Sequence, residues 1–250
     1  MHIWEADMSA MLELKNLYGG YGKITILNGT TFSIPRGTIT TVIGPNGAGK
    51  STVFKAIFGM LDIQSGSIMF DGEDVTRSTP KQMIGHGVTY VPQGRNVIPQ
   101  LSVWHNLEMG GITSSDQPSV KRRMELVMDQ FPMLRKFKDR KAIELSGGQQ
   151  KQLEIARSLL LDPKLVLIDE PSIGLSPNLV QEVFETLKTL RDEGVTILMV
   201  EQNAKAALAM SDDGIVLELG QMRMHERADV LLGDPRVGQL FLGGHMEEVA

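Results

Sequence analysis

The 250-residue sequence contains no cysteine, which excludes disulfide bonds and thiolate metal sites. It also lacks any apolar run of the roughly 18–20 residues that a helix needs to cross a bilayer. The longest candidates, residues 195–200 and 165–168, have the length of β-strands. The first ten residues include Glu5 and Asp7 and have no uninterrupted apolar core, so they do not form a secretory signal. A net charge of -5 argues against a broad nucleic-acid-binding surface.

The strongest motif is a glycine-rich stretch at residues 44–52. It matches the P-loop pattern G-x-x-x-x-G-K-[ST] and lies between a strand-like run at 39–43 and a helix-like run at 52–60. Glycines let the backbone curl around phosphate oxygens, and the following helix directs its positive end at the same anion. Lys50 supplies a charge for the β- and γ-phosphates, and Ser51 a hydroxyl for Mg²⁺. The predicted nucleotide-binding residues are Gly44, Pro45, Asn46, Gly47, Ala48, Gly49, Lys50, Ser51 and Thr52.

A second motif narrows the choice among kinases, GTPases and motors, which all carry P-loops. The apolar run 165–168 predicts a buried strand that ends in Asp169 and Glu170. At the carboxyl end of a strand, where open α/β sheets bind ligands, Asp169 would orient the Mg²⁺ shell. Glu170 is placed to polarise the attacking water as a general base. The alternative interpretation is an ordinary strand followed by an exposed acidic turn.

Strands and helices alternate along the chain, which predicts a parallel sheet with helices on both faces. Residues 11–42 are typical of short strands with a break at 18–22. The later segment 178–192 has a one-sided apolar pattern and predicts a helix, with Ser176 as its N-cap and Gly194 as its stop. Further helices are expected at 80–84, 102–109, 120–130, 149–160 and 204–210, and further strands at 38–43, 66–70, 195–200 and 214–219.

A third motif, Leu-Ser-Gly-Gly-Gln at residues 145–149, leads into the helix expected at 149–160. A serine hydroxyl and glycine amides at a helix N-terminus can meet a phosphate; the alternative is that Ser146 acts only as a helix cap. The motif closely resembles the signature of ATP-binding cassette (ABC) ATPases, and the resemblance extends over residues 11–244. It implies an α/β cassette with a mostly parallel core sheet flanked by helices, an N-terminal antiparallel β region and an inserted α-helical subdomain at about 94–160. Residues 1–10 would be a flexible extension and residues 245–250 a tail.

In that family, two cassettes form a head-to-tail dimer. Each ATP is held between the P-loop of one cassette and the signature motif of the other. The resemblance therefore implies ATP and Mg²⁺ as cofactors and a second ABC ATPase chain, a copy or a sister subunit, as partner. It adds to the nucleotide-binding set Ser146, Gly147, Gly148 and Gln149.

The resemblance also assigns roles to isolated residues. Tyr21 is similar to the aromatic residue that stacks on adenine; the alternative is a core tyrosine in a turn. Gln93 is similar to the glutamine that contacts Mg²⁺ and senses the membrane partner; the alternative is a turn residue after Pro92. Residues 172–176 resemble the D-loop, which crosses the dimer interface. The metal set is then Ser51, Gln93 and Asp169.

One position departs from the family pattern. After the strand at 195–200, most cassettes carry a histidine that contacts the γ-phosphate, whereas this chain has Gln202. Glutamine donates a hydrogen bond but carries no charge. Two interpretations follow: Glu170 is the main base and Gln202 a weaker polariser, or the site is slow and a partner's site does most of the turnover. The first is favoured, and it makes Glu170 and Gln202 the predicted catalytic residues.

The same departure indicates a subfamily. The run Val-Glu-Gln-Asn-Ala at 200–204 resembles one of the two ATPase subunits of branched-chain amino acid importers, as do residues 90–95, 101–111 and 241–244. The resemblance implies two membrane permeases and, indirectly, a periplasmic or extracellular solute-binding protein as partners, no nucleic acid, and a place on the cytoplasmic face of the membrane. Three alternatives stay open: an importer of urea or short amides, a regulatory ATP-binding subunit with weak hydrolysis, and a homodimer serving a lipid or polysaccharide exporter.

Overall fold

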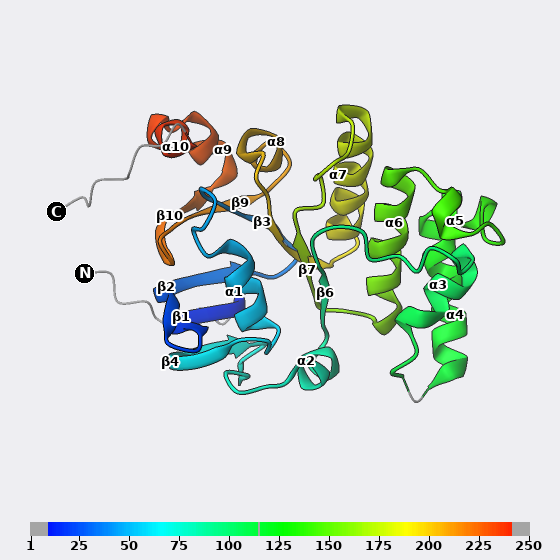
Figure 1. Ribbon diagram of the computed structural model, residues 1–250, viewed down its shortest axis with the longest axis horizontal. Helices are drawn as coiled ribbons and strands as arrows, with labels where there is room; N and C mark the ends of the chain where they lie inside the picture. The colour runs from blue at the N-terminus through cyan, green and yellow to red at the C-terminus, as the bar shows by residue number, and fades with distance from the viewer. Residues whose placement is uncertain (1–9, 115, 242–250) are drawn as a thin grey trace.

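The computed structural model describes residues 10–114 and 116–241. Of the extension expected at residues 1–10, residues 1–9 lie outside the described residues, as does the tail expected at 245–250, and Ala10 begins the first strand. In Figure 1 an antiparallel sheet, a larger sheet and a group of helices lie side by side across the molecule. The α/β fold with an N-terminal antiparallel region and a mostly parallel core sheet is confirmed.

The antiparallel sheet contains four strands in the order β2-β1-β4-β5. The break expected at residues 18–22 is wrong, because β1 continues to Tyr21 and the turn follows it. Register shifts at residues 14–18 let both neighbouring strands stay paired through the irregular segment. The strands are β1 (Ala10–Tyr21), β2 (Ile24–Pro35), β4 (Asp62–Phe70) and β5 (Glu73–Asp74).

The larger sheet has six strands in the order β10-β9-β3-β8-β7-β6, and only β10 runs antiparallel to its neighbour. Every residue of β3, β7 and β8 is buried, as expected for parallel strands covered on both faces. The sequence patterns did not predict β6 or β10. The strands are β3 (Ile39–Ile43), β6 (Val88–Val91), β7 (Leu165–Asp169), β8 (Thr196–Val200), β9 (Asp213–Glu218) and β10 (Gln221–Arg227).

Helices flank the sheet, and those from α3 to α6 gather at the end of the molecule far from the antiparallel sheet (Figure 1). The division of this region into a separate subdomain at 94–160 stays a prediction. Ser176 precedes α7, as expected, but its side chain makes no capping hydrogen bond. None of the described helices is long and apolar enough to cross a membrane. The helices are α1 (Lys50–Ile57), α2 (Pro80–His86), α3 (Val103–Gly110), α4 (Gln117–Gln130), α5 (Pro132–Lys136), α6 (Gly147–Ser158), α7 (Pro177–Asp192), α8 (Ala204–Leu208), α9 (Ala228–Gly233) and α10 (Pro235–Phe241).

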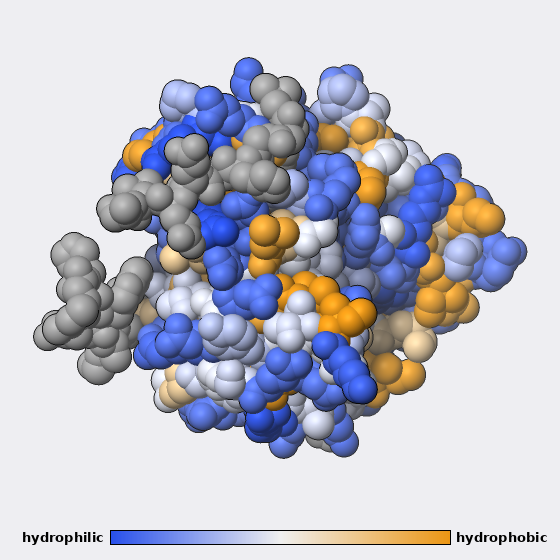
Figure 2. Space-filling view, turned by 60° about the vertical axis from the view of Figure 1, so that its left-hand side comes forward, coloured by the Kyte–Doolittle hydropathy of each residue, from blue (hydrophilic) through white to orange (hydrophobic). Residues whose placement is uncertain are grey.

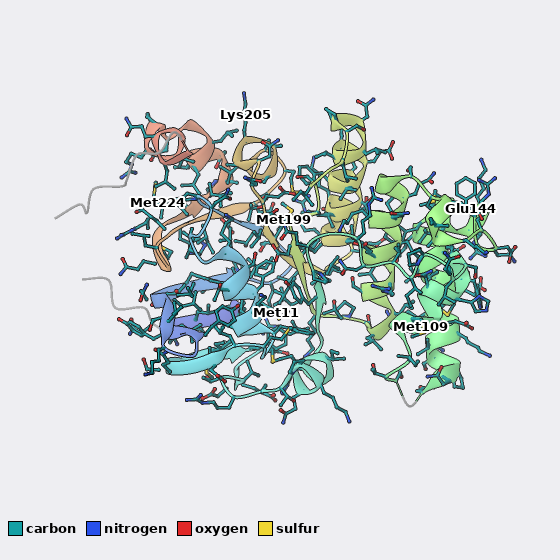
Figure 3. All side chains as sticks on the ribbon, in the orientation of Figure 1. Met11, Met109, Glu144, Met199, Lys205 and Met224 are labelled. Atoms are coloured by element: carbon teal, nitrogen blue, oxygen red, sulfur yellow. The ribbon has the colours of Figure 1, made fainter. Side chains whose placement is uncertain are left out.

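The two faces of the core sheet contribute to different hydrophobic clusters. Along β7, Val166 and Ile168 join the cluster that includes α3, α4, α6 and α7, whereas Leu165 and Leu167 join the cluster with α1 and the antiparallel sheet. Alternation of side chains along a strand explains this division. Met199 on β8 lies near the centre of the molecule, between the two groups of elements (Figure 3).

The turn between β9 and β10 connects the core sheet to the antiparallel sheet and to the P-loop. The Gly220 carbonyl accepts hydrogen bonds from the Asn28 amide (2.9 Å) and the Thr30 hydroxyl (2.6 Å), and its amide donates to the Ala48 carbonyl (2.9 Å). Gly220 has a φ of 74°, and a Cβ there would lie 1.7 Å from the Ile26 carbonyl oxygen. Only glycine permits this close approach of two backbones.

We therefore expect Gly220→Ala to lower the free energy of unfolding far more than Gly72→Ala. Both glycines have a similar positive φ (74° and 81°), but nothing lies within 4 Å of a Cβ at Gly72. The control should lose only the backbone strain, about 1–2 kcal/mol. Urea unfolding of the two variants checks this expectation, and equal losses would show that the contact with Ile26 does not matter.

Candidate functional site

The P-loop connects the end of β3 to the first residue of α1. Three of its glycines have positive φ angles: Gly44 (154°), Gly47 (81°) and Gly49 (99°). A Cβ at Gly44 would lie 2.1 Å from the Leu217 carbonyl oxygen, so the loop begins where two backbones touch. The loop thus curls at the carboxyl end of the parallel sheet and leads into a helix N-terminus, an arrangement suited to phosphate.

Lys50 is folded back over this loop. Its ammonium Nζ donates to the carbonyl oxygens of Gly44 (2.8 Å) and Pro45 (3.0 Å). Burial lowers the pKa of Lys50, and the negative charges of Glu170 and Asp169 act in the opposite direction. The ammonium is therefore held at the mouth of the loop, between the two acids and the position of an incoming phosphate.

Asp169 is hydrogen-bonded to two hydroxyl groups, one of which, on Ser51, would join it in holding a divalent cation. The Ser51 hydroxyl donates to its Oδ1 and the Tyr90 hydroxyl to its Oδ2, each over 3.2 Å. Burial raises the pKa of Asp169, while these two hydrogen bonds and the charge of Lys50 lower it. The described residues contain no cluster of three or more His, Cys, Asp or Glu side chains suited to a metal. A hydroxyl and one carboxylate instead fit Mg²⁺, which takes few protein oxygens alongside phosphates.

Glu170 follows Asp169 in a strained conformation. Its φ of 48° is uncommon for a residue with a side chain, and its amide donates to the Val200 carbonyl (2.9 Å). The Gln93 side-chain amide donates to Glu170 Oε2 over 2.8 Å, which joins two segments 77 residues apart. The structure thus brings Gln93, Glu170 and the Asp169–Ser51 pair together, as a site for water next to a phosphate requires.

Gln202 reaches the P-loop from the end of β8. Its Nε2 lies 3.4 Å from Asn46 Oδ1. The neighbouring Glu201 is buried and accepts hydrogen bonds from the Ser172 amide (2.9 Å), the Ser172 hydroxyl (2.8 Å) and the Gln202 amide (3.2 Å). Glu201 therefore ties the segment that resembles the D-loop to the position of Gln202.

Tyr21 and the signature serine Ser146 are exposed, whereas Gly148 of the signature motif is buried. The Tyr21 side chain is 46% exposed, with Lys55 Nζ 5.6 Å from its ring centre, so the interpretation as a core tyrosine is wrong. Ser146 caps α6 in a reciprocal capping box with Gln149. Within the described part of the chain, no hydrogen bond joins residues 146–149 to the P-loop. The predicted nucleotide-binding residues therefore form two separate groups.

Comparison with known proteins decides the family. A family model described as "ABC transporter" matches residues 27–173. The chain belongs to the ABC transporter family. It is 40% identical over 234 residues to the high-affinity branched-chain amino acid transport ATP-binding protein BraG of Pseudomonas aeruginosa, covering 94% of this chain and 100% of that one. It is also 37% identical to a probable branched-chain amino acid transport ATP-binding protein, LivF, of Archaeoglobus fulgidus (93% and 99% covered). The lipopolysaccharide export protein LptB of Escherichia coli is 30% identical (94% and 98%).

Solved structures of ABC cassettes have the same fold. A nucleotide-free cassette from an ABC transporter superposes with a TM-score of 0.86 at 28% identity, over 94% of this chain and 100% of that one. A dimeric cassette in a post-hydrolysis state with ADP and Pi superposes with a TM-score of 0.73 at 25% identity, over 87% and 99%. This ABC protein is thus an ATPase of a family whose cassettes bind ATP and ADP and form dimers.

Sequence reasoning missed two residues of this ABC ATPase site. Tyr90 was noted only as part of a resemblance, yet its hydroxyl contacts Asp169, and burial raises the pKa of that hydroxyl. Glu201 was noted only within a motif. Its position directly after β8, whose residues are apolar apart from Thr196, is the available signal, since an acid there lies at the same sheet edge as Asp169 at the end of β7.

We expect the stability of this ABC ATPase to depend on pH through Glu201. Burial, with a smaller contribution from the charge of Glu170, raises the pKa of Glu201 above its ordinary 4.5. A raised pKa means that the fold favours the protonated form, so this contribution is present below pH 4.5 and is lost as pH rises through the folded-state value. Glu201→Gln removes this titration. The unfolding free energy of the variant should therefore rise relative to wild type as the pH increases above 4.5.

Urea unfolding at several pH values measures this difference, with the exposed Glu182→Gln as control. A difference between wild type and Glu201→Gln that does not change with pH would contradict the prediction.

Proposed function

We propose that this chain is the ATP-hydrolysing subunit of a multisubunit importer for branched-chain or related hydrophobic amino acids. The observation that carries the proposal is the end-to-end match to BraG, a branched-chain amino acid transport ATP-binding protein, at 40% identity. Import of urea or short amides uses the same kind of ATPase subunit and is the alternative. Lipopolysaccharide export, suggested by the more distant LptB, is less well supported at 30% identity.

In the proposed reaction, ATP binds with its phosphates in the P-loop and its adenine on the exposed ring of Tyr21. Lys50 pairs with the β- and γ-phosphates, and Ser51, Asp169 and Gln93 would hold Mg²⁺. The bound ion would neutralise charge on the phosphates. Glu170 accepts the proton of the water that attacks the γ-phosphorus, the bond to the β-phosphate oxygen breaks, and ADP and phosphate leave. Gln202 donates a hydrogen bond toward the γ-phosphate from its place beside Asn46.

A second ATPase chain, either a copy or a sister subunit, completes each site in this proposal. The signature residues 146–149 lie at the N-terminus of α6, where Ser146 is exposed and Gly148 is buried, and they make no hydrogen bond to the P-loop among the described residues. A head-to-tail partner would place its own Ser146 and glycine amides on the ATP held at Lys50. ATP then favours the closed dimer by its differential affinity for the closed state, and hydrolysis reopens it.

Replacing the base should abolish turnover but preserve binding. We expect Glu170→Gln to lower kcat by about 10²-fold or more, because a neutral amide cannot accept the proton, while ATP still binds at the intact P-loop. Steady-state phosphate release and equilibrium ATP binding measure the two effects. Gln202→His is the companion variant: a wild-type rate near zero that this variant restores would support a regulatory ATP-binding subunit instead.

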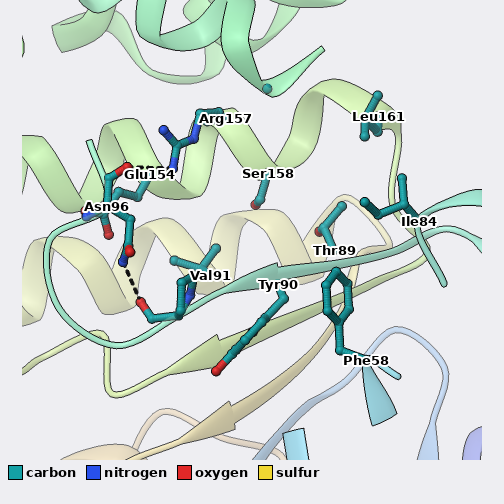
Figure 4. Close-up of a pocket in the computed structure, with 12 residues that line it drawn as sticks. Phe58, Ile84, Thr89, Tyr90, Val91, Asn96, Glu154, Arg157, Ser158 and Leu161 are labelled. Atoms are coloured by element: carbon teal, nitrogen blue, oxygen red, sulfur yellow. Dashed lines mark hydrogen bonds between the residues drawn. The ribbon is translucent and has the colours of Figure 1, made fainter. Parts of the chain in front are cut away.

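A groove beside Gln93 provides a docking surface for the permeases in this proposal. It encloses about 160 Å³ and lies between β6 and α6, with the side chains of Phe58, Ile84 and Leu161 along it (Figure 4). The Thr89 hydroxyl lines the groove, is buried, and has no hydrogen-bond partner among the described residues. The lining combines apolar side chains with the polar Asn96, Glu154 and Arg157, a mixture that suits an amphipathic segment of a partner.

The attachment to the membrane would then be indirect. No described helix is suited to cross a bilayer. The face in Figure 2 is largely hydrophilic, with hydrophobic residues in separate groups and no continuous band. The permease subunits would therefore hold the chain at the cytoplasmic face of the membrane, and a solute-binding protein would act on their other side.

Arg95, which is exposed and two residues from Gln93, tests the docking surface. We expect Arg95→Ala to leave the ATPase rate of the isolated chain within about twofold and to abolish the stimulation of ATPase by transported solute in vesicles with the permeases. Lys205→Ala, an exposed cation on α8 (Figure 3), is the control. Coupling that survives Arg95→Ala would count against this groove as the permease contact.

A further inference from the structure

Three charged side chains on one face of α6 hold the loop at residues 94–96. Lys151, Glu154 and Arg157 follow each other at three-residue intervals, so they point in the same direction. Lys151 Nζ donates to the Gly94 carbonyl (2.9 Å), and Glu154 Oε1 accepts from the Asn96 amide (2.5 Å). The Arg157 guanidinium donates to the Asn96 carbonyl over 2.8 Å. Figure 4 shows Glu154 and Arg157 directed from the helix toward Asn96.

The Lys151–Glu154 pair is almost completely removed from solvent. The two side chains are 5% and 1% exposed, and the ammonium lies 2.6 Å from Glu154 Oε2. Desolvating two charges offsets most of their attraction, so replacing a buried ion pair by apolar residues is often neutral or stabilising. Stability therefore does not explain why this helix carries the pair, whereas its hydrogen bonds to the loop backbone do.

The loop at residues 94–96 adjoins the ATP site proposed for its own chain, whereas α6 begins at the signature motif, which is proposed to contact the ATP of a second chain. Directly before the clamped segment, Gln93 contacts Glu170 at the proposed ATP site of its own chain. The Asn96 side chain donates to the Pro92 carbonyl (2.9 Å), which braces the loop around Gln93. At the other end, α6 begins with the capped Ser146 of the signature motif.

We infer that Lys151, Glu154 and Arg157 are positioning residues that make the Gln93 loop and the signature helix move as one body. The engagement of Gln93 at one ATP then sets where Ser146 stands against the ATP of the second chain. This inference rests on the ATPase activity and on the proposed cassette dimer, and it does not depend on the transported solute.

The test is the double variant Lys151→Met with Glu154→Leu, which keeps the side-chain volume and removes both bonds to the loop. It is measured in the ATPase assembly in which the wild-type chain shows turnover. We expect the melting temperature to be maintained or raised and the affinity for ATP to stay within about twofold, because no P-loop residue changes. We expect kcat to fall by about fivefold or more, the lower end of typical coupling between sites.

The control is Glu185→Leu with Lys188→Met on α7, an ion pair of the same three-residue spacing that is exposed rather than buried. Among the described residues, no hydrogen bond joins this pair to the loop at residues 94–96 or to the signature motif, so its loss should leave kcat unchanged. If the first double variant fails to fold, Arg157→Met removes only the bond to the Asn96 carbonyl and is judged by the same criteria.

A kcat within twofold of wild type in a folded variant would overturn the inference, as would a loss of ATP affinity that matches the loss of kcat. Loss of amino acid transport with an unchanged kcat would count against the clamp while leaving the proposed importer function intact.

Discussion

The buried parallel register of β3, β8 and β7 is the constraint on which the candidate site depends. Val42 pairs with Val200, and Asp169 pairs with the same Val200, so all three strands end at one edge of the sheet. Because every residue of these strands is buried and alternate residues belong to different hydrophobic clusters, a one-residue slip in register would move each side chain to the wrong cluster. Asp169 ends β7, and the P-loop, Glu170 and Gln202 follow within two residues of the three strand ends, which places them at one edge of the sheet.

Sequence patterns were informative where a motif and its secondary structure are local. The P-loop between β3 and α1, the acids after β7 and the cap at Ser146 were all predictable from neighbouring residues, because each is determined by a few consecutive side chains. The strand β6 was missed because four residues are too few for a pattern, and β10 because its residues are only half-buried. The contact between Gln93 and Glu170 could be expected only from resemblance, since nothing local specifies the partner of a residue 77 positions away.

The separation of the predicted nucleotide-binding residues into two groups has a structural cause. The P-loop belongs to the hydrophobic cluster shared with α1 and the antiparallel sheet, whereas α6 packs in the cluster on the opposite face of the core sheet. The capping box at Ser146 satisfies its helix end without a ligand, so the motif keeps its shape when no phosphate is near. A predicted site divided in this way would change its geometry if the helices of one face moved relative to the sheet. The loop at residues 94–96 is a point where such movement would meet the catalytic residues.

Glutamine in place of the histidine of most cassettes changes the charge at position 202 more than the geometry of the site. Its amide reaches Asn46 in the P-loop, and its backbone is held by Glu201, which in turn holds Ser172. A histidine in this place could bring a positive charge next to the phosphate, and glutamine cannot. Gln202 therefore keeps a hydrogen-bond donor beside the P-loop but cannot supply a positive charge there. Lys50 is the cation bonded within the P-loop.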